Sequence, residues 1–202
     1  MQIKSKKELD FVIQADMMMN RGKFRYTLKD RIKNLFIPDP IMNYLKAMRC
    51  VAYYRNKRGG EKRKYYNMRF YSLGVKLGFS VSCDALGYGV VIPHYGTIVI
   101  GGYNHIGNYA VLHTSSCITG NEKHIGDALY LSTGAKITSE LVLGNNISIG
   151  ANSVVNKSYE GDNALIAGIP AKYIKDTEAW YIRDHFEDRI NKVENLKQKM
   201  RL

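Results

Sequence analysis

Four of the five histidines in this chain of 202 residues lie in a single stretch rich in glycine and aliphatic residues. Histidine is the side chain best suited to exchange a proton near neutral pH. For any one of them, a solvent-facing turn position is the simpler explanation, but the group as a whole favours a functional role. The four are His94, which stands in the stretch VIPHYGTIVIGG, and His105, His113 and His124.

The elements that must position these histidines repeat every six residues. Large aliphatic residues recur at this step, with Gly, Ala, Ser and Asn between them. A step of six fits neither a helix nor a simple alternating strand, and it is typical of a hexapeptide β-helix. Shifts at 98–100 and between 118 and 125 join three runs. The runs are Leu86, Ile92 and Ile98; Ile100, Ile106, Leu112 and Ile118; and Ile125, Leu131, Ile137, Leu143, Ile149 and Val155.

The repeat predicts a mainly β protein, a parallel β-helix over residues 81–175. Three units form one triangular coil, and the aliphatic residue of each unit points inward. His105 and His124 each precede an inward isoleucine, so we expect them to stack on neighbouring coils about 5 Å apart. By the same count, His94 and His113 are also about one coil apart.

The segments on either side of the repeat are predicted to be helical, in a region over 1–80 and a C-terminal amphipathic helix over 176–202. SKKE at Ser5–Glu8 is a capping-box pattern that opens a first helix. Pro40 and Gly59-Gly60 are start and stop signals for a second helix, and a third is expected over 64–78. The residues at helical spacing near the C-terminus are Ile182, Phe186, Ile190, Val193 and Leu196.

Charge is concentrated in the first part of the chain. Residues 1–80 carry 19 Lys+Arg and 6 Asp+Glu, whereas residues 81–202 carry 11 and 12. A basic region of this kind suits a polyanion, and the densest run is RNKRGGEKRK at 55–64. Because no nucleic-acid-binding motif accompanies the run, we expect a solvated helix end or peripheral membrane contact, and no nucleic acid.

The sequence points to a reduced compartment. It has no run of 18 apolar residues that would predict a membrane span, and its basic start lacks the apolar segment of a secretory signal. The three cysteines, Cys50, Cys83 and Cys117, are too scattered for a disulfide framework or a zinc site. We expect a cytoplasmic protein, with the inner face of the membrane as an option.

Several motifs resemble those of hexapeptide-repeat acyltransferases, which share a left-handed β-helix. One branch, the serine acetyltransferases, places a helical region in front of it. The resemblance covers roughly residues 40–175. Its most specific parts are PHYGTIVIG (93–101), GDALYLSTGAKI (126–137), IGANSVV (149–155) and AGIPAKYI (167–174).

The resemblance implies acetyl transfer from acetyl-CoA to a hydroxyl, without a metal. It also implies a homotrimer or a dimer of trimers, with CoA in the groove between neighbouring β-helices. His94 matches the family's catalytic histidine, which removes the proton of the acceptor hydroxyl. The positions that fall where CoA would lie are Gly134, Ala135, Lys136, Gly150, Ala151 and Lys172.

Departures from the family pattern concern the acceptor. Serine acetyltransferases read Asp-His where this chain reads Pro93-His94, and Arg-His where it reads Asn121-Glu122. Groups expected to hold serine's charged backbone are therefore missing, although Asp84 or an N-terminal acid could reach in. We expect the hydroxyl of a sugar or polysaccharide precursor as acceptor, with Pro93, His113, Glu122 and His124 on the substrate side.

Other readings stay open at this point. One is a serine O-acetyltransferase of cysteine biosynthesis with a rearranged substrate loop. Another is a non-catalytic hexapeptide scaffold. A third is a carbonic anhydrase of this fold, which needs three metal-binding histidines converging between subunits. His105, His113 and His124 could imitate such a set, but AGIPAK and the helical N-terminal region favour the transferase.

Overall fold

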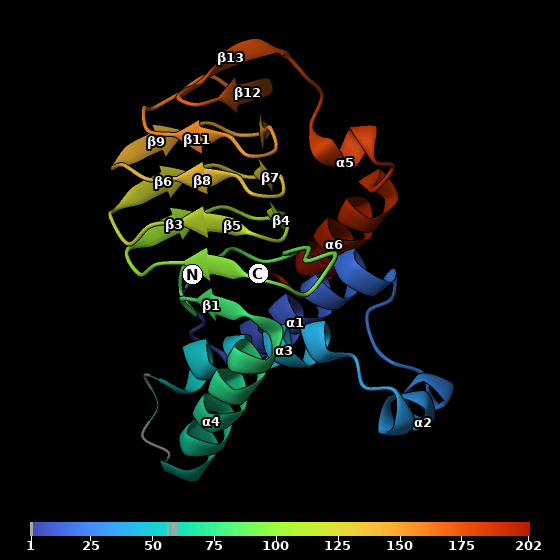
Figure 1. The fold of residues 1–202 in the computed structure, drawn as a ribbon. Coiled ribbons are helices and arrows are strands. Elements are labelled where there is room, and N and C mark those ends of the chain that lie inside the picture. Colours follow the sequence, from blue (N-terminus) through green and yellow to red (C-terminus); the bar gives the residue numbers. More distant parts are fainter. Residues whose placement is uncertain (1, 56, 58–59) are drawn as a thin grey trace.

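The computed structural model describes residues 2–55, 57 and 60–202. Helices come first, a parallel β-helix follows, and two more helices end the chain (Figure 1). The helices are α1 (Lys6–Arg21), α2 (Leu28–Phe36), α3 (Pro40–Tyr54), α4 (Gly60–Leu77), α5 (Trp180–Arg183) and α6 (Glu187–Lys199). The strands are β1 (Phe79–Val81), β2 (Ile98–Ile100), β3 (Asn104–Ile106), β4 (Val111–Leu112), β5 (Ser116–Ile118), β6 (Lys123–Ile125), β7 (Tyr130–Leu131), β8 (Lys136–Ile137), β9 (Leu141–Leu143), β10 (Ile147–Ile149), β11 (Val154–Val155), β12 (Ala164–Gly168) and β13 (Ala171–Asp176).

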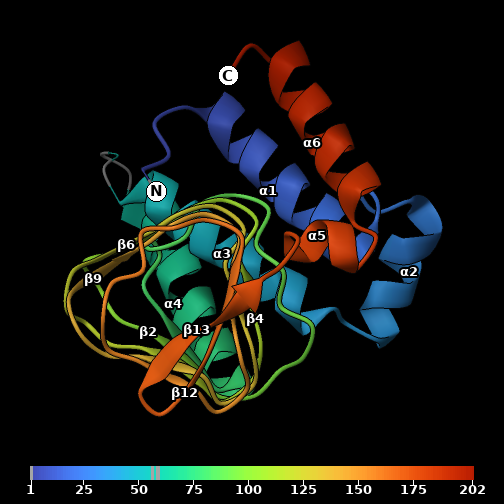
Figure 2. The same cartoon turned by 90° about the horizontal axis from the view of Figure 1, so that it is seen from above.

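The strands form the three faces of a left-handed parallel β-helix, as predicted (Figure 2). The first face has the order β1-β2-β5-β8-β11, the second β3-β6-β9, and the third β4-β7-β10-β12. The antiparallel strand β13 closes the third face at the end of the β-helix. The inward residues stack in buried columns, of which Ile100, Ile118, Ile137 and Val155 make one.

The predicted register needs one correction, at the start of the repeat. Ile98 and Ile100 lie on the same strand, β2, and both are buried. The inward residue that precedes Ile100 is Ile92, so the step between them is eight positions instead of six. The two extra residues therefore belong to the loop at 93–97, which leaves the regular coil and contains His94.

The corner between the second and third faces is held by a ladder of Asn and Asp side chains. The Asp127 carboxylate accepts from the backbone N–H of Asn108 at 2.7 Å, and the side-chain amide oxygen of Asn145 accepts from the backbone N–H of Asp127 at 2.9 Å. Asp162 continues the ladder by accepting from Asn145 N–H at 2.6 Å. Short polar side chains at this corner thus satisfy backbone donors that the turn would otherwise leave unpaired.

The first residues of the helices that begin after Ser5 and at Pro40 agree with the sequence prediction more closely than their last residues do. Ser5 caps α1 by accepting from Glu8 N–H, but Glu8 bonds Lys4 N–H, so the reciprocal half of the capping box is absent from these described residues. The helix that opens at Pro40 ends at Tyr54, and Gly59 of the predicted stop lies outside the described residues.

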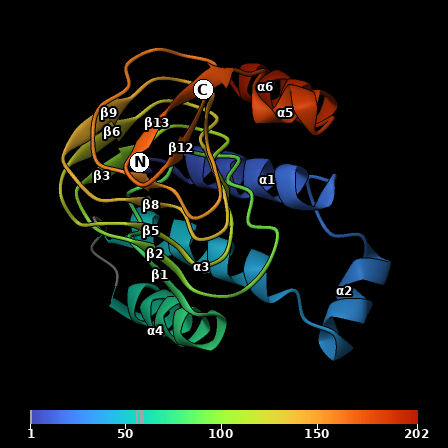
Figure 3. The same ribbon diagram turned by 45° about the horizontal axis from the view of Figure 1, so that its top comes forward.

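Two helical features differ from the sequence prediction. The helix α2, which was not predicted, is opened by a capping box between Thr27 and Asp30. The predicted C-terminal helix is divided in two, because His185 adopts a left-handed conformation with φ of 60° between α5 and α6. This break lets α5 lie against the β-helix while α6 packs along α1 (Figure 3).

A buried ion pair joins the helices to the first coil. Arg49 of α3 bonds both carboxylate oxygens of Asp16 of α1, at 2.8 and 3.2 Å, and each side chain is only 1% exposed. Arg49 also donates to the carbonyls of Leu86 and Gly87, and Asp16 accepts from Val90 N–H at 3.1 Å. The pair therefore satisfies backbone groups at the open edge of the first coil.

The C-terminal segment packs on both the β-helix and the helical region. Trp180 is buried and its Nε1 donates to the Tyr109 carbonyl at 2.9 Å. Arg189 of α6 donates to the Met19 carbonyl at the end of α1 at 2.7 Å. Glu194 accepts from the hydroxyls of Tyr88 and Tyr109. The C-terminal segment thus bonds both the first two coils of the β-helix and the end of α1.

Replacing Arg49 by methionine should lower the free energy of unfolding by about 3–5 kcal/mol, because the carboxylate of Asp16 would stay buried without its partner. Urea unfolding followed by circular dichroism measures the loss. The control is Arg25→Met, which breaks the exposed pair with Asp10 and should cost less than about 1 kcal/mol. Equal losses for the two variants would contradict the role given to Arg49.

Candidate active site

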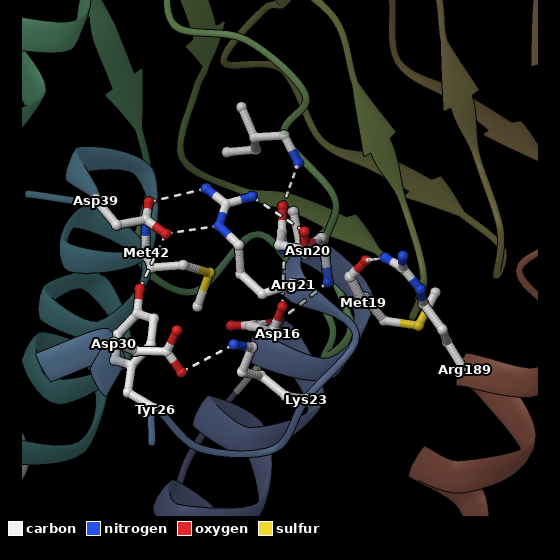
Figure 4. A network of polar contacts seen from close by, with 12 residues as sticks. Asp16, Met19, Asn20, Arg21, Lys23, Tyr26, Asp30, Asp39, Met42 and Arg189 are labelled. Atoms are coloured by element: carbon white, nitrogen blue, oxygen red, sulfur yellow. Dashed lines mark hydrogen bonds and ion pairs between the residues drawn. The ribbon is translucent and has the colours of Figure 1, made fainter. Parts of the chain in front are cut away.

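The loop that carries His94 is fixed at both ends by the helical region. On one side, the Asn20 side chain donates to the Val90 carbonyl at 2.6 Å and accepts from Ile92 N–H at 3.1 Å (Figure 4). On the other side, Gly96 N–H donates to the Leu77 carbonyl at 3.0 Å. Between these anchors His94 is exposed, so it is not a buried structural histidine.

His113 lies one coil beyond His94 at the same corner. Its Nε2 is 2.9 Å from the hydroxyl of Tyr130, which lies on the next coil. Burial lowers the pKa of His113, and the positive charge that His94 can carry lowers it further. A charge on His94 therefore opposes protonation of His113. The structure brings together Pro93, His94 and His113 of the predicted site.

Arg183 at the end of α5 and Asp184 just after it lie near His113, and no spacing in the sequence predicted this. The guanidinium of Arg183 lies 4.4 Å from the centre of the Tyr130 ring, a cation–π contact. Arg183 also pairs with Asp184 at 2.8 Å. Both charges act on the pKa of His113, where Asp184 raises it and Arg183 lowers it. Tyr130 and Arg183 are thus neighbours of the histidine pair contributed by different elements.

A cavity of about 490 Å³ opens next to His94, between its loop and the helical region. The loop contributes Pro93, His94 and Tyr95 to one wall. The opposite wall comes from the end of α1, from α2 and from the start of α3. It is lined by Arg21, Lys23, Tyr26, Asp30, Lys33, Asn34, Ile37, Pro38, Asp39, Pro40 and Ile41.

Both carboxylates in this cavity wall are held by cations of the same chain (Figure 4). Asp39 accepts two hydrogen bonds from Arg21, at 2.5 and 2.8 Å, and one from Tyr26. Burial alone would raise the pKa of Asp39, but the hydrogen bonds outweigh it, and the pKa lies below its usual range. Lys23 and the Thr27 cap lower the pKa of Asp30 to about 2.

The residues predicted to line CoA follow the same corner as His94, on later coils. Gly134 N–H donates to the Thr114 carbonyl at 3.0 Å, which places its turn directly beyond that of His113. Gly134 has φ of 74°, and a Cβ there would collide with the Asn152 side chain on the next coil. Glycine is therefore the residue that this stacked corner accommodates.

The remaining predicted CoA positions continue this column. Ala135 is buried and Lys136 is exposed, and the Lys136 ammonium donates to the Gly134 carbonyl at 2.9 Å. Gly150 lies against Ala167, which pairs with Lys172 in the closing hairpin. Ala151 is exposed beside Gly150. One edge of the β-helix thus runs from the histidine pair to the hairpin.

Glu122 lies at a different edge, between the first and second faces, and His124 follows it on strand β6 of the second face. The His124 ring stacks on that of His105 with 5.0 Å between ring centres, as predicted, and its Nε2 is 3.1 Å from the Glu122 carboxylate. Within one chain these residues are not joined to the His94 corner. The sequence analysis grouped them with His94 because counting repeats predicts the coil on which a residue lies. The count does not predict which edge of the β-helix the residue faces.

The loop that precedes His124 is held by a lysine that is buried. Lys123 donates to the Asn121 carbonyl at 2.7 Å and to the carbonyl and hydroxyl of Thr119, both at 3.1 Å. Burial lowers the pKa of Lys123. Asn121 and Glu122, which stand at the positions of the Arg-His pair, are thus fixed in a short exposed turn.

Among the described residues, no three His, Cys, Asp or Glu side chains form a group that could hold a metal ion. His113 lies on a different edge from His105 and His124, and it bonds Tyr130. One chain therefore does not bring together the three histidines named for an anhydrase.

No family model matches the sequence, and no curated protein matches it significantly. In structure, the chain is similar to a serine acetyltransferase in complex with CoA, with 18% identity, a TM-score of 0.60, and 83% of this chain and 69% of that chain covered. The Neisseria gonorrhoeae serine acetyltransferase is 18% identical, with a TM-score of 0.62 and coverage of 90% and 72%. The Brucella abortus serine acetyltransferase in complex with coenzyme A is 21% identical, with a TM-score of 0.58 and coverage of 85% and 68%. The predicted fold, a hexapeptide-repeat β-helix behind a helical region, is confirmed.

Replacing His94 by glutamine should raise the pKa of His113, because it removes one of the charges that oppose protonation of His113. In the unmodified protein His113 should titrate below the ordinary value of about 6.5. Nitrogen-15 NMR of the histidine rings measures both values. His105→Gln, on another edge, is the control and should leave the His113 titration unchanged. An unchanged pKa in His94→Gln would show that the two rings do not interact.

Proposed function

We propose that this protein is an acetyl-CoA-dependent O-acetyltransferase that acetylates a hydroxyl of a sugar or polysaccharide precursor. One observation carries the proposal. His94 is exposed at the head of a corner column that contains the expected CoA positions, and a cavity large enough for a small acceptor opens on its other side. The shared fold with serine acetyltransferases, including structures with CoA bound, supports the acetyl donor.

In the proposed reaction, neutral His94 takes the proton of the acceptor hydroxyl as its oxygen attacks the thioester carbonyl. The new C–O bond forms, the C–S bond breaks, and the CoA sulfur leaves with the proton returned by His94. A positioned imidazole contributes about 10²–10⁴-fold to such a step. The neighbouring His113 is held toward its own neutral form, because burial and a charge on His94 both lower its pKa.

The proposed donor site lies along the corner from Gly134 to Lys172, in a groove between neighbouring β-helices. A homotrimer, or a dimer of trimers, supplies such grooves, because triangular prisms pack side by side around a threefold axis. Backbone N–H groups at the corner turns can stabilise the oxyanion of the tetrahedral intermediate. The reaction needs no metal, since the base and the oxyanion donors are supplied by the protein.

The acceptor is argued from the charges that face the cavity. An amino acid needs an anion for its ammonium group, but Pro93 offers none. Asp30 and Asp39 already bind Lys23 and Arg21. A sugar hydroxyl needs no such anion. The wall carries a third cation, Lys33, beyond those two ion pairs, and this positive charge suits the phosphate of a nucleotide-linked or lipid-linked sugar. A cytoplasmic protein at the inner face of the membrane would meet such precursors.

The second candidate is a serine O-acetyltransferase of cysteine biosynthesis. The observation that favours it is the presence of two N-terminal carboxylates, Asp30 and Asp39, in the cavity wall beside His94. Serine would bind there if its ammonium displaced the bound lysine or arginine side chain. This exchange distinguishes the two candidates, because the sugar acceptor leaves both ion pairs in place.

His94→Ala should lower kcat by about 10²-fold or more with little change in the affinity for acetyl-CoA, because the imidazole acts in the transition state. CoA release with the preferred acceptor measures kcat. His124→Ala, on another edge, is the control and should cost much less, as should His113→Ala. Near-normal turnover in His94→Ala together with an inactive His124→Ala would show that the base is wrongly assigned.

Free L-serine should be acetylated weakly or not at all, whereas a nucleotide-linked or lipid-linked sugar should be acetylated measurably. A site that lacks the partner of a charged group binds that group poorly. CoA release measured with each acceptor at equal concentration is the test. Robust turnover of serine that saturates at low concentration would reject the sugar acceptor and support the second candidate.

A further inference from the structure

The helix α2 exposes an apolar edge that the rest of the described chain does not cover. None of its nine residues is buried. Leu35 and Phe36 are 79% and 82% exposed. An exposed stripe of this kind on a short helix marks an interaction surface. Its members are Leu28, Ile32, Leu35 and Phe36, continued by Ile37 just after the helix.

The surroundings of this edge are strongly basic. Residues 21–37 contain six Lys+Arg and one acid, Asp30, which is already bound by Lys23. Lys29, Arg31 and Lys33 lie on α2 itself. A helix with Leu, Ile and Phe on one side and Lys and Arg around them is typical of helices that lie in a membrane interface. The positive charge favours anionic lipids.

The position of α2 suits the same role. Figures 1 and 3 show α2 projecting from the body of the molecule, near the end of the β-helix that carries β1. It also contributes to the site, because Lys33 and Asn34 of α2, and Ile37 just after it, line the cavity next to His94. None of the helices in the described part of the chain is long and apolar enough to cross a membrane. Because α2 has only nine residues, contact through it would be with the membrane surface.

We propose that α2 is an interfacial helix that inserts its apolar edge among the lipids of an anionic membrane and places the opening of the His94 cavity at the headgroup level. Membrane binding itself does not depend on the proposed function. What rests on that function is the consequence that a lipid-linked acceptor reaches His94 from the bilayer surface.

A second copy of this chain fits the surface less well. The other exposed apolar face of the helical region, on α4, includes Met68, Tyr71 and Val75. It is also basic, with Lys62, Arg63, Lys64, Arg69 and Lys76 on the same helix. Joining two such faces would bring like charges together, which opposes association. An anionic bilayer is complementary to α2 in both its apolar and its charged groups.

The test is flotation of the full chain with vesicles of phosphatidylcholine containing about 30% phosphatidylglycerol, which mimic an anionic leaflet. Leu35→Ser/Phe36→Ser should weaken binding at least about tenfold, because both side chains leave the bilayer. A matched pair of single variants sharpens the comparison. Ile32→Ser, at a residue 53% exposed on α2, should weaken binding, and Ile174→Ser, at a residue 54% exposed on the closing hairpin, should not.

Further outcomes separate this proposal from its alternatives. Binding should fall when salt is raised and should be lost on pure phosphatidylcholine. Unchanged flotation of Leu35→Ser/Phe36→Ser would overturn the proposal. Dissociation of the lipid-free oligomer by this variant, seen by light scattering, would overturn it in favour of a second copy. CoA release with a water-soluble acceptor should stay unchanged in the Leu35→Ser/Phe36→Ser variant. If the proposed function is wrong, neither the variant nor the unmodified protein releases CoA, and the flotation result still tests membrane binding on its own.

Discussion

The structure depends on one buried ion pair, between Asp16 and Arg49. A parallel β-helix has an open first coil, whose backbone N–H and C=O groups have no preceding coil to bond. Arg49 and Asp16 supply those bonds from α3 and α1, at the carbonyls of Leu86 and Gly87 and at the Val90 N–H group. Two buried charges would be costly apart, so each keeps the other in place. The closing hairpin does the corresponding work at the other end.

Helix α1, which carries Asp16, also contributes to the candidate site. Asn20 lies one turn after Asp16 on α1, and its amide bonds both Val90 and Ile92 in the way a neighbouring strand would. The next residue, Arg21, binds Asp39, the cap of α3. One helix end therefore closes the first coil, fixes the loop of His94 and builds the opposite wall of the cavity. A change that loosens α1 should for this reason disturb the fold and the site together.

How much the sequence predicts depends on whether a feature is periodic. The β-helix and the stacking of His105 on His124 follow from a six-residue step, and both are confirmed. Their inward residues are buried in columns. Helix α2 was not predicted because none of its nine residues is buried among the described residues, so no core pattern marks it, and its start depends on a Thr27–Asp30 capping box.

The candidate site was harder to predict because it combines edges and elements. Tyr130 and Arg183 reach His113 from a later coil and from α5, and no local spacing relates them. Glu122 and His124 were grouped with His94 although they lie on another edge. The break at His185 that lets α5 reach the β-helix is a single left-handed residue inside an otherwise helical pattern. Such a break depends on packing, which the helical spacing of the sequence does not contain.

The two irregularities of the repeat explain where its candidate chemistry lies. A regular coil keeps each inward residue six positions from the next, so extra residues must leave the prism at a corner. The eight-residue step from Ile92 to Ile100 exposes His94 at one corner, and the seven-residue step from Ile118 to Ile125 exposes Glu122 at another. In the cyclic trimer that we propose, a given edge of one prism faces a different edge of its neighbour. The two irregular turns can therefore meet only across a subunit boundary, which makes assembly a condition for a site that uses both.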